Sequence, residues 1–134
     1  MATRGWGKAT MPRKGARISS GRRTARSKYG AVKTVVDGIT FASKAEARRY
    51  GQLRVLQASG LIFGNLILQP VYRIYVKPLG GDPIVVAKYI GDFQYEAADG
   101  TKVVEDVKGF KTPVYRLKKK LVEALYGIEI REVR

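Results

Sequence analysis

Hydrophobic positions along the chain fall into short runs separated by Gly, Pro and Asp, and the two clearest runs have the composition of β-strands. Residues 85–95 are rich in β-branched and aromatic side chains, and residues 101–108 contain Val103, Val104 and Val107. Between the two runs lies Asp99-Gly100, a typical hairpin turn sequence. The pattern predicts an antiparallel hairpin of two strands, 85–95 and 101–108.

Three charged residues of this hairpin form a candidate site. Side chains of a strand point alternately to its two faces, so Asp106 and Lys108 share a face and Glu105 takes the other. If Asp92 on the preceding strand points the same way, two carboxylates and an ammonium converge on one spot. The competing interpretation is a solvated strand face, because Asp-x-Lys is a common spacing.

The remaining strand patterns surround this hairpin. A short hairpin is expected over residues 35–41, turning at Asp37-Gly38, and strands are expected within residues 61–68 and over residues 71–76. The alternating residues 128–133 predict a last strand. No internal repeat is present.

The first predicted helix begins after Ser43 and ends at Gly60. Glu46, three residues after Ser43, completes a capping box. Glu46 also leans toward the apolar stripe of this helix, where a carboxylate would favour a metal or its water shell as a partner. Both roles stay open from the sequence. The stripe consists of Tyr50, Leu53 and Leu56.

The second predicted helix begins at Thr112-Pro113, an N-cap followed by proline at the first helical position, and Gly127 ends it. Because a strand follows this helix, a crossover and some parallel pairing are expected. The chain is therefore predicted to be an α/β protein with helices packed on a mixed sheet. The apolar face is expected to comprise Val114, Leu117, Leu121 and Leu125, and the basic face Arg116, Lys118, Lys119 and Lys120.

The charge balance indicates a polyanionic partner. Among 134 residues there are 26 Lys and Arg against 11 Asp and Glu, a net charge of +15. Such a field favours nucleic acid first and an anionic membrane surface second. No apolar run approaches the roughly 20 residues of a membrane span, and the start lacks the apolar core of a secretory signal. We expect a soluble intracellular protein with no membrane partner.

The basic residues are concentrated at the start of the chain. Residues 1–28 contain no acid and predict a disordered arm, followed by one domain over residues 29–134. The arm is interpreted as a contact to phosphates without sequence readout, with a solubilising tail or localisation signal as the alternatives. Its basic residues include Arg22, Arg23, Arg26 and Lys28. In the domain, Lys111, Arg116, Lys119 and Lys120 are the candidate DNA contacts, although a solvated helix face explains some of them equally well.

The absence of cysteine and histidine narrows the chemistry. Without cysteine there is no disulfide framework or thiolate zinc site, and without histidine there is no zinc finger, HNH-type nuclease or Ser-His-Asp triad. Any metal is then held by carboxylates, which suits Mg²⁺ or Mn²⁺.

The ordered set of these residues resembles the PD-(D/E)XK nuclease superfamily, whose fold is restriction-endonuclease-like. A helix carrying Glu46, a strand carrying Asp92 and a strand with Asp106-x-Lys108 come in that superfamily's order, followed by a helix and a strand. More narrowly, the chain resembles a family of small phage-borne nuclease-like proteins over about residues 28–133. The segments that carry this likeness are FASKAEARRYGQLRVLQASGLI, LQPVY, YIGDFQYE and VVEDVKGFKTPVYRLKKKLVEALYGIEI.

The resemblance implies roles for individual residues. Asp92 and Asp106 would hold Mg²⁺ or Mn²⁺ together with a main-chain carbonyl near Val107, and Lys108 would orient the attacking water or neutralise the developing charge. Glu46 matches the helix glutamate of junction resolvases and would hold a second metal or an outer-shell water. Gln69 lies where some members carry a polar active-site residue. The chain departs from the superfamily pattern in having Gly91 where the superfamily name has proline, and Glu105 beside Asp106 makes the second acidic position ambiguous.

The resemblance further implies metal-dependent hydrolysis of DNA phosphodiester bonds, leaving 5′-phosphate and 3′-hydroxyl ends. Backbone contacts without base readout suit DNA shape, so a branched substrate in phage recombination or packaging is expected, in the cytoplasm of a phage-infected or prophage-bearing bacterium. A homodimer is in keeping with the resolvases of this superfamily. Two alternatives remain open: a non-catalytic DNA-binding protein on a nuclease fold, and a basic protein that assembles with nucleic acid.

Overall fold

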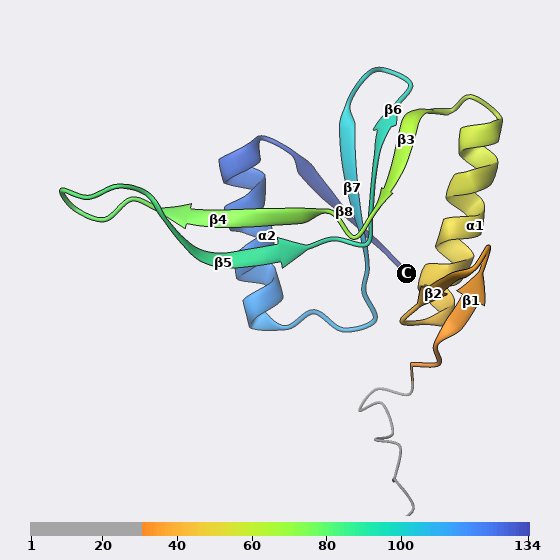
Figure 1. The fold of residues 1–134 in the computed structure, drawn as a ribbon, viewed down its shortest axis with the longest axis horizontal. Coiled ribbons are helices and arrows are strands. Elements are labelled where there is room, and N and C mark those ends of the chain that lie inside the picture. The colour runs from red at the N-terminus through yellow and green to blue at the C-terminus, as the bar shows by residue number, and fades with distance from the viewer. Residues whose placement is uncertain (1–30) are drawn as a thin grey trace, which may run out of the picture.

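A four-stranded mixed sheet forms the centre of the fold (Figure 1). The computed structural model describes residues 31–134, so the predicted arm over residues 1–28 lies outside the described residues. Antiparallel pairs join neighbouring strands except the last two, which run parallel. The parallel pair is connected by helix α2 (Pro113–Tyr126), which confirms the predicted crossover. The strand order is β3 (Ile62–Leu68), β6 (Phe93–Ala97), β7 (Lys102–Val107) and β8 (Glu129–Val133).

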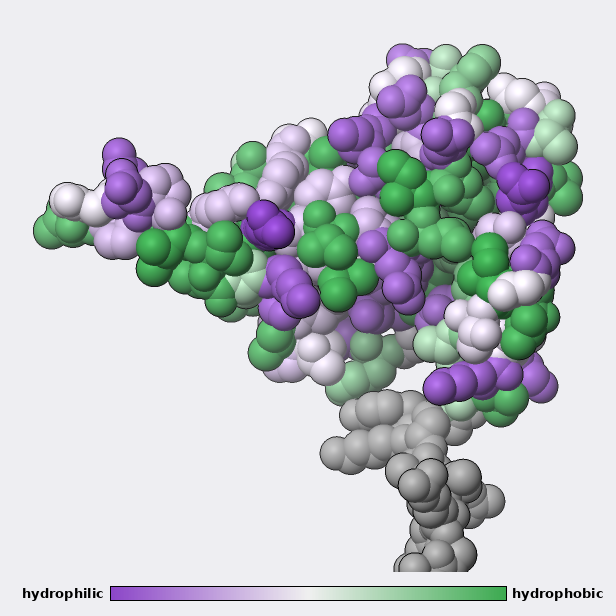
Figure 2. Space-filling view, viewed as in Figure 1, coloured by the Kyte–Doolittle hydropathy of each residue, from purple (hydrophilic) through white to green (hydrophobic). Residues whose placement is uncertain are grey.

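Two hairpins stand beside this sheet. β1 (Thr34–Val36) and β2 (Ile39–Phe41) pair across Asp37-Gly38, where both residues have positive φ, as the predicted Asp-Gly turn requires. β4 (Val71–Val76) and β5 (Ile84–Ile90) pair as a longer hairpin whose loop extends away from the sheet (Figure 1). Hydrophobic side chains cover much of this extension (Figure 2), including Val76, Leu79 and Ile84, which are all exposed.

The prediction of one continuous strand over residues 85–95 was wrong, because the chain breaks at Gly91-Asp92 and changes sheets there. β5 pairs with β4, whereas β6 pairs with β3 and β7. At the break, the Gly91 N–H donates to the Pro70 carbonyl at 3.0 Å. A Cβ at Gly91 would lie 2.9 Å from a Val104 methyl carbon, closer than real Cβ contacts come. The break therefore depends on glycine, and it leaves Asp92 outside both strands.

Helix α1 (Lys44–Ala58) covers one face of the sheet. Its capping box forms as predicted, since the Ser43 hydroxyl accepts from the Glu46 N–H at 3.2 Å. The predicted stripe is also confirmed: Tyr50 and Leu53 are buried and Leu56 is partly buried. These side chains belong to what we call the α1 cluster, whose buried members are Phe41, Ala47, Tyr50, Leu53, Ile62, Phe93, Tyr95 and Val103.

Helix α2 covers the other face together with the β4–β5 hairpin, but not through the predicted stripe. The side chains of Val114, Leu117, Leu121 and Leu125 are all exposed, whereas Tyr115 and Val122 are buried. Aromatic packing explains the choice, because Tyr115 lies against Tyr89 and Tyr126 meets Tyr72 edge to face, with ring centres 5.0 Å apart. We call the buried set the α2 cluster: Tyr72, Ile74, Tyr89, Val104, Tyr115, Val122 and Ile130.

The architecture is thus α/β, with a mixed sheet between two helical layers. Neither of the helices in residues 31–134 is long and apolar enough to cross a membrane. Strand β7 lies at the centre of this arrangement. Its valines alternate between the two layers, Val103 in the α1 cluster and Val104 in the α2 cluster.

Candidate functional site

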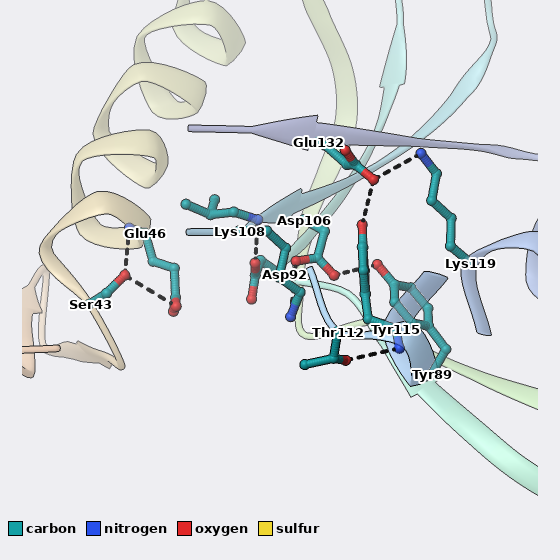
Figure 3. Close-up of polar contacts among 11 residues, drawn as sticks. Ser43, Glu46, Tyr89, Asp92, Asp106, Lys108, Thr112, Tyr115, Lys119 and Glu132 are labelled. Carbon is teal, nitrogen blue, oxygen red and sulfur yellow. Dashed lines mark hydrogen bonds and ion pairs between the residues drawn. The ribbon is translucent and has the colours of Figure 1, made fainter. Parts of the chain in front are cut away.

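The predicted site residues meet where β5 gives way to β6 and where β7 ends. Asp92 lies in the break, Asp106 is the next-to-last residue of β7, and Lys108 follows the strand. Figure 3 shows the side chains of Asp92, Asp106 and Lys108 gathered at this edge of the sheet, with Glu46 approaching from α1. The structure therefore brings together the two carboxylates and the ammonium that the sequence pattern indicated.

Asp106 is completely buried, and its two carboxylate oxygens differ in their surroundings. Oδ2 accepts a hydrogen bond from the Tyr89 hydroxyl at 2.7 Å. Oδ1 has no hydrogen-bond partner within the described residues, although the Lys108 Nζ lies 3.3 Å away as an ion pair. A buried carboxylate oxygen without a hydrogen bond is costly, so this atom would be stabilised by a further donor or a bound cation.

Asp92 is oriented by the backbone of β7. Its Oδ2 accepts from the Val107 N–H at 2.6 Å, and its own N–H donates to the Glu105 carbonyl at 3.0 Å. Burial raises the pKa of this carboxyl to about 6; the Val107 N–H opposes the shift, and the charges of Asp106 and Glu46 reinforce it. Asp92 is therefore a carboxylate whose charge is destabilised by its surroundings and which a bound cation would stabilise.

Lys108 lies between an acid and an aromatic ring. Its Nζ is 5.0 Å from the centre of the Tyr115 ring, a cation–π contact, in addition to the Asp106 ion pair. The Lys108 N–H donates to the Val133 carbonyl at 3.1 Å, which continues the parallel pairing past the end of β7. About a third of the side chain is exposed, so the ammonium can still reach a ligand.

Glu132 is a member of this network that the sequence pattern did not single out. It pairs with Asp106 across the parallel β7–β8 ladder, and its carboxylate accepts from the Tyr115 hydroxyl and the Lys119 ammonium, each at 3.2 Å. Lys111 forms a further ion pair with it. The Lys111 ammonium, with help from Lys119, holds the pKa of Glu132 down at about 2. Aligning the ends of the two parallel strands in the sequence would have placed this residue beside Asp106.

Glu105 lies apart from this network and has a structural role. On the opposite face of β7 its carboxylate accepts hydrogen bonds from Nε and Nη2 of Arg49, at 2.7 and 2.6 Å, and from the Tyr95 hydroxyl at 2.6 Å. Burial and this carboxylate together raise the pKa of Tyr95 to about 12. The predicted opposite orientation of Glu105 and Asp106 is confirmed, and Asp106 is the acid that faces Lys108.

Glu46 and Gln69 share a pocket with Asp92. The pocket has a volume of about 150 Å³ and is also lined by Phe41 and Phe93. Glu46 remains engaged in its cap, since its carboxylate accepts from the Ser43 hydroxyl at 3.2 Å and the Ala42 N–H at 3.3 Å. Gln69 has φ of 50°, an uncommon backbone conformation for a side chain of this type, and strain of this kind is often found at functional sites.

The predicted DNA contacts divide into three groups. Arg22, Arg23, Arg26 and Lys28 lie outside the described residues. Lys111 and Lys119 are bound to Glu132, so their charges are already partly neutralised. Arg116 and Lys120 are exposed on α2.

The donor set fits one kind of metal better than others. Within residues 31–134 no three His, Cys, Asp or Glu side chains gather closely enough to form a metal-binding group, so Glu46 does not complete a cluster with the two aspartates here. Two carboxylates, one with an oxygen lacking a hydrogen bond, suit Mg²⁺, which usually takes one or two carboxylates and fills its remaining positions with water and phosphate oxygens. They do not suit a closed structural zinc site.

The fold and the site define a class: an α/β protein with a carboxylate–lysine cluster at the edge of a mixed sheet. Residues 26–133 match the family described as Protein of unknown function (DUF1064), so the chain belongs to that family. No curated protein and no solved structure matches the chain.

Proposed function

We propose that the protein is a divalent-metal-dependent DNA endonuclease of the restriction-endonuclease-like PD-(D/E)XK superfamily. The observation that carries this proposal is the Asp106 carboxylate, buried beside Asp92 with one oxygen lacking a hydrogen bond. A structural carboxylate in the same strand, Glu105, has both oxygens satisfied. The contrast favours a ligand for Asp106, and an oxygen-seeking cation is the ligand that two carboxylates recognise.

The surroundings of each side chain suggest its role. A Mg²⁺ or Mn²⁺ ion bound by the two aspartates would supply a Lewis acid for a phosphodiester. Val107 and Tyr89 hold Asp92 and Asp106 in fixed orientations through their hydrogen bonds. Asp106 and the Tyr115 ring orient the Lys108 ammonium. This group can donate to a phosphate oxygen as negative charge develops on that oxygen. Hydrolysis adds water across the P–O bond, and the superfamily resemblance implies 5′-phosphate and 3′-hydroxyl products.

The finer parts of the proposal rest on the sequence resemblance and the charge. A net charge of +15 supports a nucleic acid substrate. The likeness to small phage-borne nuclease-like proteins supports action on branched DNA in phage recombination or packaging, in the cytoplasm of the bacterial host. The same likeness to junction resolvases supports a homodimer.

The test is cleavage of labelled single-stranded, duplex, flap and four-way junction DNA by the full chain, with Mg²⁺, Mn²⁺ or EDTA. We expect metal-dependent cutting that Asp106→Asn and Lys108→Met abolish, while Asp82→Asn, an exposed acid in the β4–β5 loop, cuts normally. A folded protein that binds DNA but cuts none of these forms would refute the enzyme and leave a DNA-binding protein.

A matched pair of variants separates the two roles of Glu46. Glu46→Gln keeps a side chain that can complete the capping box but removes the charge, whereas Ser43→Ala removes the cap and leaves the charge. If Glu46 takes part in the chemistry, only Glu46→Gln lowers the cleavage rate at full folding. If it is solely a cap, Ser43→Ala loses stability, Glu46→Gln stays close to the wild type, and neither changes the rate of the folded protein.

A further inference from the structure

A second pocket is lined by Lys108 and shares no lining residue with the pocket of Asp92, Glu46 and Gln69. It has a volume of about 370 Å³ and lies between β5 and the start of α2. Three lysines line it, Lys88, Lys108 and Lys118, together with Tyr89 and Tyr115. No acid lines this pocket, whereas Asp92 and Glu46 line the other one. The nearest recorded carboxylate is Asp106, which contacts Lys108 and Tyr89 of the pocket wall.

The lysines of this pocket have little internal compensation. Within residues 31–134, neither Lys88 nor Lys118 forms an ion pair with a carboxylate, and Lys108 has only Asp106. By contrast, Lys111 and Lys119 a few residues away are both bound to Glu132. Three lysines that line one pocket with a single carboxylate partner among them favour an anion in it.

The start of α2 adds neutral donors to the same pocket. Thr112, the N-cap, and Val114 both line it. The Thr112 hydroxyl already accepts from the Tyr115 N–H, so the side chain caps the helix. The N-terminal end of a helix carries partial positive charge, which favours an anion there in addition to the lysines.

We propose that this pocket binds a backbone phosphate of a nucleic acid strand next to the phosphate that lies at Asp92, Asp106 and Lys108. This inference rests on the proposed function in taking the ligand to be DNA. Lys108 lines the pocket and contacts Asp106, so it lies between the two phosphates, and Lys88 and Lys118 hold the second one. The pocket thus fixes which way the strand leaves the site.

The test compares two double variants of the full chain with the same loss of charge. Lys88→Gln/Lys118→Gln removes the pocket lysines, and Lys77→Gln/Lys102→Gln removes two exposed lysines outside the pocket. Affinity for labelled duplex and single-stranded DNA is measured in EDTA over a series of salt concentrations. We expect the pocket variant to bind about tenfold more weakly and its salt slope to fall by about one, while the control changes less than threefold. Equal losses in both variants would overturn the proposal, because bulk charge would then explain them.

Competition and cleavage distinguish the remaining outcomes. Inorganic phosphate or a mononucleotide should displace DNA from the wild type only at phosphate concentrations far above that of a competing oligonucleotide, because the strand is held at several phosphates. Displacement by either one at the same phosphate concentration as the oligonucleotide would assign the pocket to a free phosphate and overturn the proposal. A larger loss of binding to phosphatidylglycerol vesicles than to DNA would also overturn it. If the protein cuts DNA, the pocket variant should raise KM with kcat nearly unchanged. Binding is measured without metal, so the pocket can be supported even if the protein never cuts DNA. Conversely, a pocket variant that binds like its control would overturn the pocket without contradicting the proposed nuclease.

Discussion

Asp92→Asn should stabilise the protein at neutral pH in the absence of metal. Burial raises the pKa of the Asp92 carboxyl from an ordinary 3.8 to about 6. A shift of this size destabilises the folded chain by about 3 kcal/mol once the carboxyl is ionised. The amide oxygen of asparagine can still accept from the Val107 N–H, and the pKa of about 6 already includes the effect of that bond on the charged form. The expected gain is therefore about 3 kcal/mol at pH 7.5.

The sign of the effect gives a pH signature. Because the folded pKa lies above the unfolded one, the contribution of Asp92 to stability is greatest below about pH 4 and is lost as the pH rises toward 6 and beyond. The stability difference between Asp92→Asn and the wild type should therefore grow over this window and level off above it. Chemical denaturation in EDTA from pH 4 to 8 measures the difference, with Asp82→Asn as the exposed control. A difference that is constant with pH, or a less stable Asp92→Asn at pH 7.5, would refute the reasoning.

Adding metal should reverse the ranking. A cation bound by Asp92 and Asp106 stabilises the wild type by about 4.1 kcal/mol at a thousand times its Kd, and the variant by much less. Protons compete for the same carboxylate, so the metal should bind more weakly below about pH 6. Titration of Mg²⁺ or Mn²⁺ followed by denaturation measures both effects. Equal stabilisation of the two proteins by metal would remove Asp92 from the proposed ligand set.

Three further substitutions test the framework of the site by chemical denaturation at pH 7.5. Tyr89→Phe removes the hydrogen bond to the Asp106 carboxylate and should lower the free energy of unfolding by about 1–3 kcal/mol; no loss would mean that this bond contributes nothing. Gly91→Ala should cost about 1–3 kcal/mol through the methyl contact with Val104, and combining it with Val104→Ala should cost less than the sum of the two; strict additivity would contradict the contact. Glu105→Gln breaks the bidentate ion pair with α1 and should cost about 2–3 kcal/mol, with no change in any cleavage rate per folded molecule; a lost rate at full folding would give this residue a role in chemistry.

Local sequence signals predicted much of the fold. The Asp37-Gly38 turn, the Ser43 and Thr112 caps and the alternation of Glu105 and Asp106 each depend on a few neighbouring residues, and all are found in the structure. The intervening helix predicted some parallel pairing, which the structure shows between β7 and β8. These features were accessible because their physical causes lie within one element or one connection.

The features that the sequence did not reveal depend on partners distant in the chain. Helix α2 has apolar side chains on two faces. The face with Tyr115 and Val122 is buried because it packs against the tyrosines of the β4–β5 hairpin. The break at Gly91-Asp92 depends on the close approach of Pro70 and Val104, which no local pattern indicates. Glu132 joins the site through the register of β7 and β8, and register is a property of two strands rather than one.

The division of the core into two clusters means that the site depends on both. Asp92 shares a pocket with Glu46, Phe41 and Phe93 of the α1 side, whereas Asp106 and Lys108 are held by Tyr89 and Tyr115 of the α2 cluster. Local opening of either layer would separate the carboxylates from part of their support while leaving the other layer folded. Hydrogen exchange at the Val107 amide, whose proton is held by Asp92, should therefore follow the less stable of the two layers. The temperature at which the site is lost would then be that layer's melting temperature, below the temperature at which the whole chain unfolds.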